Sequence, residues 1–101
     1  MDNLDSSKEI LKAIEMPEKQ QNNLCAYTLL SLAHIYPDNN WNQANNDWIG
    51  IHDIIQFISN NYDYTYAENS RESIRKDAIH QFRDAAIVED NRLILQITNI
   101  N

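Results

Sequence analysis

YAENSRESIRKDAIHQFRDAA, residues 66–86, is the stretch on which the fold of this chain depends. Asn69 followed three residues later by Glu72 is the pattern of a capping box, which predicts a helix over 70–86. Apolar residues then recur at spacings of three and four, so one stripe of this helix should face a core. The stripe consists of Ile74, Ala78, Phe82 and the pair Ala85 and Ala86.

The opposite side of this predicted helix is polar and cationic. Arginine and lysine neutralise phosphates, arginine pairs with guanine edges, and Asn and Ser side chains reach phosphates or bases. The composition is that of a DNA-recognition helix, although composition alone favours an ordinary solvated face. The residues concerned are Ser73, Lys76, His80 and Arg83, with Arg71 and Arg75 near the helix start.

The composition predicts one mainly helical domain. The chain has 101 residues, and its 43% apolar content supports a real core. One glycine and two prolines leave little material for tight turns, which argues against an all-β sandwich. The single cysteine, Cys25, excludes an intramolecular disulfide and fits a reducing cytosol. The acidic N-terminus does not resemble a signal peptide, and no apolar run approaches the roughly 20 residues of a membrane span. A cytoplasmic protein with no membrane partner is expected.

The net charge of −7 opposes nucleic-acid binding, but the acidic residues are unevenly distributed. Residues 69–92 hold five basic and five acidic side chains, whereas the rest of the chain holds three basic and ten acidic ones. A binding face that avoids the acidic remainder is therefore feasible. Because few counterions would be released, the domain should bind DNA weakly on its own.

The first half of the chain predicts two helices and a loop. Ser6 and Glu9 form a second capping-box pattern, for a short helix that ends near Met16-Pro17. Residues 18–35 are apolar on nearly all sides, which predicts a helix in the middle of a bundle, with Cys25 as a core residue rather than a nucleophile. Pro37 stops this helix. An asparagine-rich loop follows, in which Trp41 and Trp48 are expected to anchor the loop to the core.

The second half predicts a winged helix-turn-helix. Ile51, Ile54, Ile55 and Ile58 form the stripe of a helix over 51–59, with Phe57 beside it. A short extended link with three tyrosines (Tyr62, Tyr64 and Tyr66) joins it to the helix over 70–86, an arrangement similar to a helix-turn-helix with a longer turn. Two short strands around Asp90-Asn91 then predict a hairpin that extends to Ile97. The expected fold class is a mainly α helical bundle with a small C-terminal β-hairpin.

The residues do not predict a catalytic centre or a metal site in this chain. His34, His52 and His80 lie far apart, without carboxylates or cysteines at metal-ligand spacing. The single glycine excludes a glycine-rich phosphate loop. No nucleophile elbow is present, and no lysine follows an acidic residue at the spacing of a magnesium-dependent nuclease.

The block 66–76 and its continuation through His80-Gln81-Phe82 closely resemble the N-terminal domain of BsuBI/PstI-type type II restriction endonucleases. In that family a Tyr-Ala-x-Asn-(Ser/Thr)-Arg-Glu-(Ser/Thr)-Ile-Arg-Arg run leads into His-Gln-Phe. Gln20-Gln21-Asn22 with Leu29-Leu30, and Trp41 followed by Trp48-Ile49-Gly50-Ile51, are further matches. The likeness covers most of the chain but fades after Val88, so contacts of the hairpin with DNA cannot be transferred.

The resemblance implies a larger enzyme than this chain. Members of the family act as homodimers, cut a palindromic DNA site with magnesium, and carry the nuclease centre in a C-terminal domain. Residues 1–101 are therefore expected to form a single winged-helix domain, an N-terminal fragment without the nuclease domain. Double-stranded DNA is the expected partner, a second copy of the chain is a candidate partner, and magnesium belongs to the missing domain.

Six residues are predicted to lie at or near the DNA groove. Arg71, Lys76 and Arg83 are assigned mainly to phosphates and Ser73 to a base edge, while Arg75 is either a DNA contact or an internal partner of Glu72 or Glu68. Two alternatives remain open: a dimerisation or docking module, and a stand-alone winged-helix transcriptional regulator. The six residues are Asn69, Ser70, Arg71, Ser73, Lys76 and Arg83.

Overall fold

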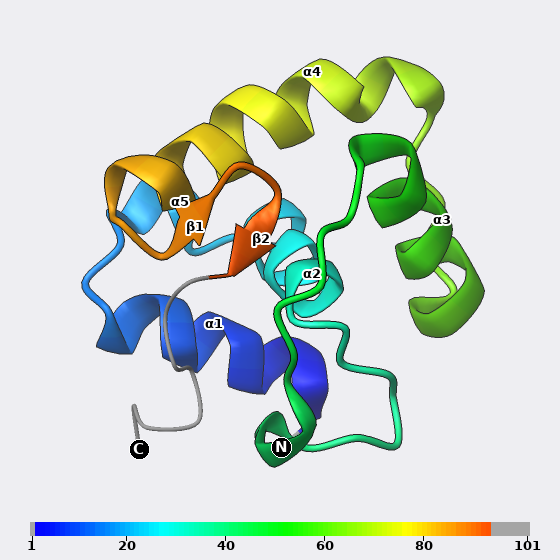
Figure 1. Ribbon diagram of the computed structural model, residues 1–101, viewed down its shortest axis with the longest axis horizontal. Coiled ribbons are helices and arrows are strands. Elements are labelled where there is room, and N and C mark those ends of the chain that lie inside the picture. Colours follow the sequence, from blue (N-terminus) through cyan, green and yellow to red (C-terminus); the bar gives the residue numbers. More distant parts are fainter. Residues whose placement is uncertain (1, 94–101) are drawn as a thin grey trace.

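The helix at the centre of the fold is α2 (Asn23–Leu32), in which every side chain from Cys25 onward is buried. The computed structural model describes residues 2–93. In it, α2 contacts α1 (Asn3–Ala13), α3 (Ile51–Tyr62) and η4 (Ile74–Ile79), a π-helical segment. Figure 1 shows α1 below α2 and the helix that contains η4 above it. The prediction of an apolar central helix is confirmed.

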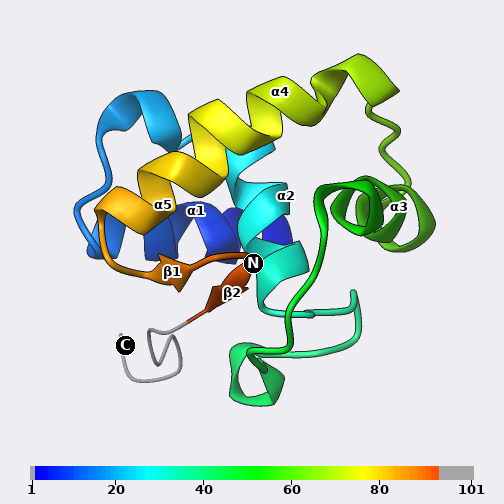
Figure 2. The ribbon, with the colours of Figure 1, turned by 45° about the horizontal axis from the view of Figure 1, so that its top comes forward.

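One continuous helix, which we call helix 71–84, follows α3 in the chain. It consists of α4 (Arg71–Ser73), η4 and α5 (His80–Asp84), and a short 3-10 turn, η3 (Glu68–Ser70), leads into it. Figure 1 places it along one edge of the molecule, on the opposite side of α2 from α1, and Figure 2 shows it from the side that faces outward. Ile74, Ala78 and Phe82 are buried as predicted, together with Ile79. Ala85 and Ala86 are exposed, contrary to the prediction, because the helix ends at Asp84.

Three helix starts differ from the predicted capping positions. The cap of α1 is Asp2, whose carboxylate accepts from the Asp5 amide at 2.8 Å, so Ser6 lies within the helix. A separate 3-10 turn, η1 (Glu18–Gln20), precedes α2, which is capped by Asn22 rather than starting at Glu18. Asn69 caps nothing, because η3 already carries the chain into helical geometry and Glu72 bonds to Arg75 instead.

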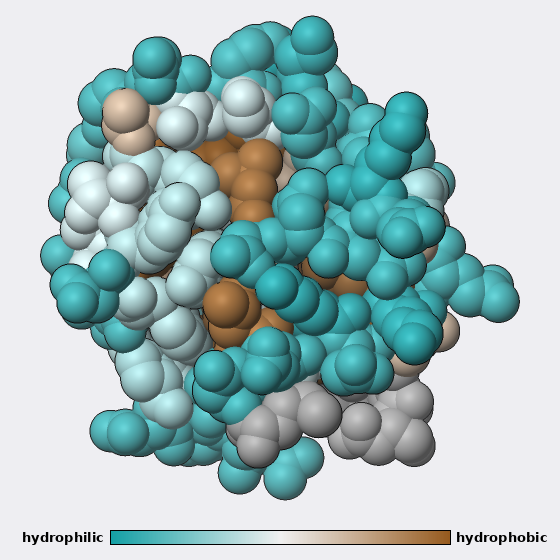
Figure 3. Space-filling model, turned by 180° about the vertical axis from the view of Figure 1, so that it is seen from behind, coloured by the Kyte–Doolittle hydropathy of each residue, from teal (hydrophilic) through white to brown (hydrophobic). Residues whose placement is uncertain are grey.

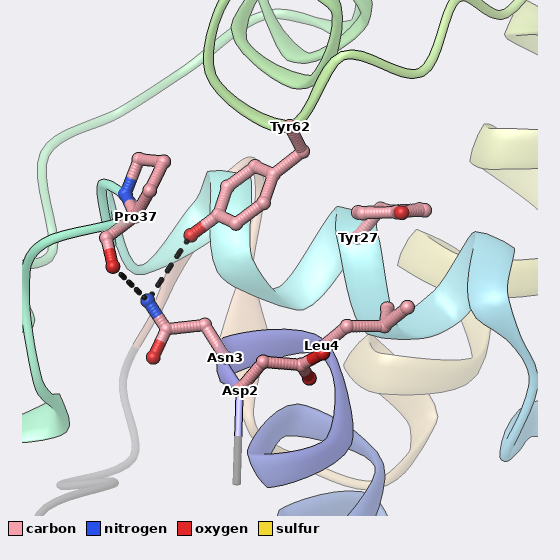
Figure 4. Close-up of a pocket in the computed structure, with 6 residues that line it drawn as sticks. All are labelled: Asp2, Asn3, Leu4, Tyr27, Pro37 and Tyr62. Atoms are coloured by element: carbon pink, nitrogen blue, oxygen red, sulfur yellow. Dashed lines mark hydrogen bonds between the residues drawn. The ribbon is translucent and has the colours of Figure 1, made fainter.

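The start of α1 is fastened to the loop after α2, where a small pocket opens (Figure 4). The side-chain nitrogen of Asn3, Nδ2, lies in this pocket, 3.1 Å from the Tyr36 carbonyl oxygen, 3.3 Å from that of Pro37 and 3.4 Å from the Tyr62 hydroxyl. These contacts favour a start at Asp2 over the equally good local signal at Ser6. They also give this pocket a structural role.

Three helices end in the same way, although none of them ends at a glycine. Glu15, His34 and Ala86 all have positive φ values, of 63°, 55° and 62°. In each case the amide of the following residue bonds to a carbonyl five positions back, which is the 6→1 bond of a Schellman motif. The following residues are apolar and buried: Met16, Ile35 and Ile87.

A two-strand antiparallel hairpin completes the described chain. β1 (Val88–Glu89) pairs with β2 (Arg92–Leu93), with Val88 opposite Leu93 and Asp90-Asn91 as the turn. Val88 and Leu93 are buried, so the hairpin covers one end of the core. The predicted small hairpin is confirmed in this part, while its continuation to Ile97 lies outside the described residues.

The two tryptophans behave differently. Trp41, in the 3-10 turn η2 (Trp41–Gln43), packs partly buried against the core as predicted. Trp48 is 53% exposed, so its assignment as a core anchor was wrong. Its indole N–H instead donates to a carboxylate oxygen of Asp90 in the hairpin turn, at 2.8 Å.

Candidate nucleic-acid interface

The link between α3 and helix 71–84 is held to α2 by stacked tyrosines. Tyr64 stacks on Tyr27 of α2 with ring centroids 5.6 Å apart, and Tyr66 packs on Tyr64 at 4.8 Å. The third tyrosine of the predicted link, Tyr62, is the last residue of α3, and its hydroxyl donates to the Ile35 carbonyl. The pKa of Tyr66 is raised to about 12, mainly by burial and to a smaller extent by the neighbouring Tyr64, Tyr27 and Cys25. The longer turn is therefore packed against the core.

The start of helix 71–84 is tied to the start of α3 through Glu68. One carboxylate oxygen of Glu68 lies 3.4 Å from His52 Nδ1, and the other lies 3.9 Å from the Arg71 guanidinium. Because all three side chains are more than half exposed, the contribution of these pairs to stability is small. Their consequence is geometric, since through Glu68 they connect the first residue of helix 71–84 to the start of α3.

The predicted site residues form two groups along helix 71–84 and the turn that leads into it. Asn69 and Ser70 lie in η3, and Arg71, Ser73 and Lys76 follow in the first turns of the helix. Arg83 lies roughly three turns beyond Arg71, near the other end. All six are exposed except Ser70, which is partly buried. Among residues 2–93, neither Lys76 nor Arg83 has a carboxylate within ion-pair distance.

Arg75 is the internal partner of Glu72, as one of its two predicted roles required. Its Nε donates to one carboxylate oxygen of Glu72 at 3.2 Å, and its Nη2 donates to the other. These hydrogen bonds, helped by the charges of Arg75 and Lys76, hold the pKa of Glu72 below its usual range. Unlike Lys76, Arg75 therefore has its charge matched by a neighbouring carboxylate.

The π-helical segment η4 was not predicted, and it changes which side chains meet. The His80 amide bonds to the Arg75 carbonyl, five residues back rather than four. The wider turn brings His80 beside Arg75, with Nε2 3.4 Å from Nη1. Nearby carbonyls take side-chain donors: the Gln81 amide reaches Lys76 O at 3.3 Å, and the Cys25 thiol reaches Asp77 O at 3.2 Å. Neither the apolar spacing nor the capping pattern of the sequence signals such a turn.

The hairpin turn is bonded to the segment before α3. The Ile49 amide donates to the Asn91 carbonyl at 3.1 Å, and the Asn91 side chain donates back to the Ile49 carbonyl at 2.8 Å. Beside them lies a small open hollow lined by Trp48, Glu89, Asp90 and Arg92. Its two carboxylates outnumber its single guanidinium, so the hollow does not favour a phosphate.

Figure 3 shows that the rear face is mostly hydrophilic, with apolar atoms in a few patches near its centre. Within residues 2–93, no group of three or more His, Cys, Asp or Glu side chains could hold a metal ion. No helix in the same range is long and apolar enough to cross a membrane.

A family model described as the BsuBI/PstI restriction endonuclease HTH domain matches residues 1–94. The chain belongs to this family. The helix-turn-helix of the family description agrees with the arrangement of α3, the tyrosine link and helix 71–84, and the hairpin completes the winged helix-turn-helix that the sequence pattern predicted. The membership is the one that the resemblance of the block 66–76 implied.

Relatives of this family are similar over most of this chain. The type II restriction enzyme BsuBI of Bacillus subtilis is 42% identical over 84% of the chain, and AplI of Arthrospira platensis is 28% identical over the same share. The solved structure of the SdaI restriction endonuclease superposes on 80% of the chain with a TM-score of 0.77 and 28% identity. The chain spans only about a quarter of each relative, namely 27%, 26% and 25%.

Proposed function

We propose that this chain is the DNA-binding domain of a type II restriction endonuclease and that it binds duplex DNA through helix 71–84. The observation that carries the proposal is an edge helix whose apolar side is buried on α2 while its cationic side is exposed. The helix-turn-helix family of the chain supports it. A helix of this kind enters the major groove with side chains near its N-terminus next to base edges.

The proposed contacts follow from the position and pairing of each side chain. Lys76 and Arg83, without carboxylate partners among residues 2–93, are assigned to phosphates, and Arg71 joins them at the helix start. Ser73 is assigned to a base edge, while Asn69 and Ser70 in η3 lie where the chain would cross the backbone. Base contacts specify a sequence and phosphate contacts set the position of the protein on the duplex.

Strand cleavage is not assigned to this chain. Within residues 2–93 the side chains do not fit a magnesium site, since no cluster of three potential ligands is present. The relatives are about four times as long. The proposal therefore places a magnesium-dependent nuclease centre in a C-terminal domain outside this chain, and a homodimer as the active form.

The Lys76→Ala variant tests the proposed phosphate contacts. The expected result is weaker binding to every duplex alike, because a phosphate contact carries no sequence information, and a salt slope reduced by about one. Fluorescence anisotropy with a labelled duplex at several salt concentrations measures both. Lys12→Ala on α1, which lies across the molecule, is the matched control and should bind as the wild type does.

A loss of binding confined to one DNA sequence would contradict the role given to Lys76.

The alternative function is a dimerisation or docking module, and only the net charge of −7 favours it over DNA binding. Size-exclusion chromatography with and without duplex separates the two functions. Self-association that is unaffected by duplex, without any complex with DNA, would overturn the proposed function.

A further inference from the structure

The guanidinium of Arg75 is held in one direction on the exposed side of helix 71–84. Glu72 accepts from Nε and Nη2 with both carboxylate oxygens, which is the bidentate geometry of the strongest arginine–carboxylate pairs. The Arg75 and Glu72 side chains are 45% and 59% exposed, so the pair lies at the surface of helix 71–84. Exposed ion pairs contribute little to stability, but this one restricts where the free edge of Arg75 points.

A second contact holds Arg75 from the other side. In a regular α-helix, residues five apart do not share a face, but the π turn places His80 next to Arg75, with Nε2 3.4 Å from Nη1. Arginine remains protonated and only donates, so the imidazole nitrogen is the acceptor. Turns of this kind are frequent at functional sites.

The remaining donors of Arg75 match a guanine. A guanidinium has five N–H groups. Two of them bond to Glu72 and one points to His80, which leaves one on each terminal nitrogen. The major-groove edge of guanine presents two acceptors, O6 and N7, and arginine contacts both. A phosphate is a poorer partner here, because its charge would lie next to the carboxylate of Glu72.

We infer that Arg75 reads a guanine in the major groove and that Glu72 and His80 are positioning residues for it. The inference rests on the proposed function, because it requires helix 71–84 to lie in the groove. The inference assigns different roles to the cations of this helix. Arg75, whose charge is matched by Glu72 and whose direction is restricted, selects a base, whereas Lys76 and Arg83 contact phosphates.

The test begins with a duplex pool that has a randomised centre. Duplexes retained by the wild-type chain are sequenced, and each base pair of the selected sequence is then changed in turn for affinity measurements. Arg75→Lys keeps the charge but removes the planar fork. The expected result is that the wild type binds duplexes with one particular G·C pair about 10- to 100-fold more tightly than duplexes in which this pair is changed. Arg75→Lys should lose the preference at this base pair and keep the preferences at the other base pairs. Lys76→Ala, the matched variant on the next residue, should keep it.

Glu72→Gln tests the positioning role. The variant should lose part of the preference at the same base pair and keep the others, and combining it with Arg75→Lys should add no further loss. A merely structural ion pair would not affect a single base pair. Because both side chains are exposed, the variants should fold, which thermal unfolding checks.

The outcomes distinguish the inference from the proposed function. If Arg75→Lys keeps the base preferences of the wild type, the role of Arg75 is overturned and DNA binding stands. The same holds if the wild type binds duplex without selecting any sequence. If the wild type binds no duplex at all, the proposed function fails and the inference fails with it.

Discussion

Cys25 shows how far residue-level prediction reaches in this chain. Its apolar surroundings in the sequence predicted a core position, and the structure places it fully buried in α2, with its thiol donating to the Asp77 carbonyl. Burial, together with the nearby Asp77 carboxylate, raises the pKa of Cys25 from 9.0 to about 12. The thiol is therefore protonated in the folded chain and unreactive as a nucleophile.

The raised pKa of Cys25 predicts a loss of stability in alkali. The Cys25 thiol has a pKa of about 12 in the folded chain and 9.0 in the unfolded chain, so the thiol loses its proton more easily when the chain is unfolded. The stability that this difference contributes is fully present below pH 9 and is lost as the pH rises toward 12. Urea unfolding at a series of pH values should show a free energy of unfolding that declines above pH 9. In Cys25→Ala the decline should be shallower, and what remains should follow the tyrosines whose pKa burial raises: Tyr27, Tyr62 and above all Tyr66, whose pKa is raised from 10.0 to about 12. Equal declines in the two proteins would contradict this prediction.

The contacts of Arg75 show where residue-level prediction stops. Its spacing from Glu72 allowed an ion pair to be expected, since residues three apart are neighbours on any helix. Its contact with His80 could not be expected, because it depends on a π turn that is stabilised by tertiary partners such as the Cys25 thiol.

At the scale of elements, apolar periodicity located the helices better than capping patterns located their starts. An apolar stripe involves many residues, so the stripes of α3 and helix 71–84 identify these helices even when the predicted first or last residue of the helix is wrong. A cap depends on one side chain, and Asp2 and Ser6 both offer a suitable one. Contacts of Asn3 with the loop at Tyr36 and Pro37 decide between them, and these partners are distant in sequence.

The left-handed helix ends predict a stabilising substitution. Ala86 has φ 62°, a region that costs an L-residue about 1–2 kcal/mol but costs glycine little. Ala86→Gly should therefore stabilise the fold by about 1 kcal/mol, after allowance for the greater freedom of glycine in the unfolded chain. Thermal or urea unfolding measures the change.

The adjacent residue provides the control for this substitution. Ala85 is also exposed but has φ −84°, which any residue adopts. Ala85→Gly should destabilise the fold by about 0.5–1 kcal/mol. If both glycine variants are destabilised to the same extent, the left-handed geometry is not what limits stability at this helix end.

At the scale of the whole molecule, the architecture was predictable from the sequence while the arrangement of charge was only partly so. The apolar α2, the tyrosine link and the hairpin turn were each visible as local patterns, and together they restrict the topology. The sequence also separated a neutral segment, 69–92, from an acidic remainder. It allowed the pair of Arg75 with Glu72 to be expected, but it did not show that Arg71 also has a carboxylate partner whereas Lys76 and Arg83 have none among the described residues.

This distribution of charge predicts how DNA binding depends on salt. With Arg71, Lys76 and Arg83 as the phosphate contacts, the logarithm of the binding constant should fall against the logarithm of salt concentration with a slope of roughly −3. Binding should accordingly be weak at physiological salt. Titrations of the isolated chain at several salt concentrations measure the slope. A slope two or three times as steep would require cationic contacts beyond this helix.

The bond between Trp48 and Asp90 gives the chain an intrinsic optical probe of its wing. The half-exposed indole of Trp48 is tied to the hairpin turn, whereas that of Trp41 is packed against the core. The two fluorophores therefore differ in solvent polarity and in access to an aqueous quencher. Emission from Trp48 reports on the surroundings of the hairpin turn, so binding of a partner next to the hairpin can be followed without attaching a dye.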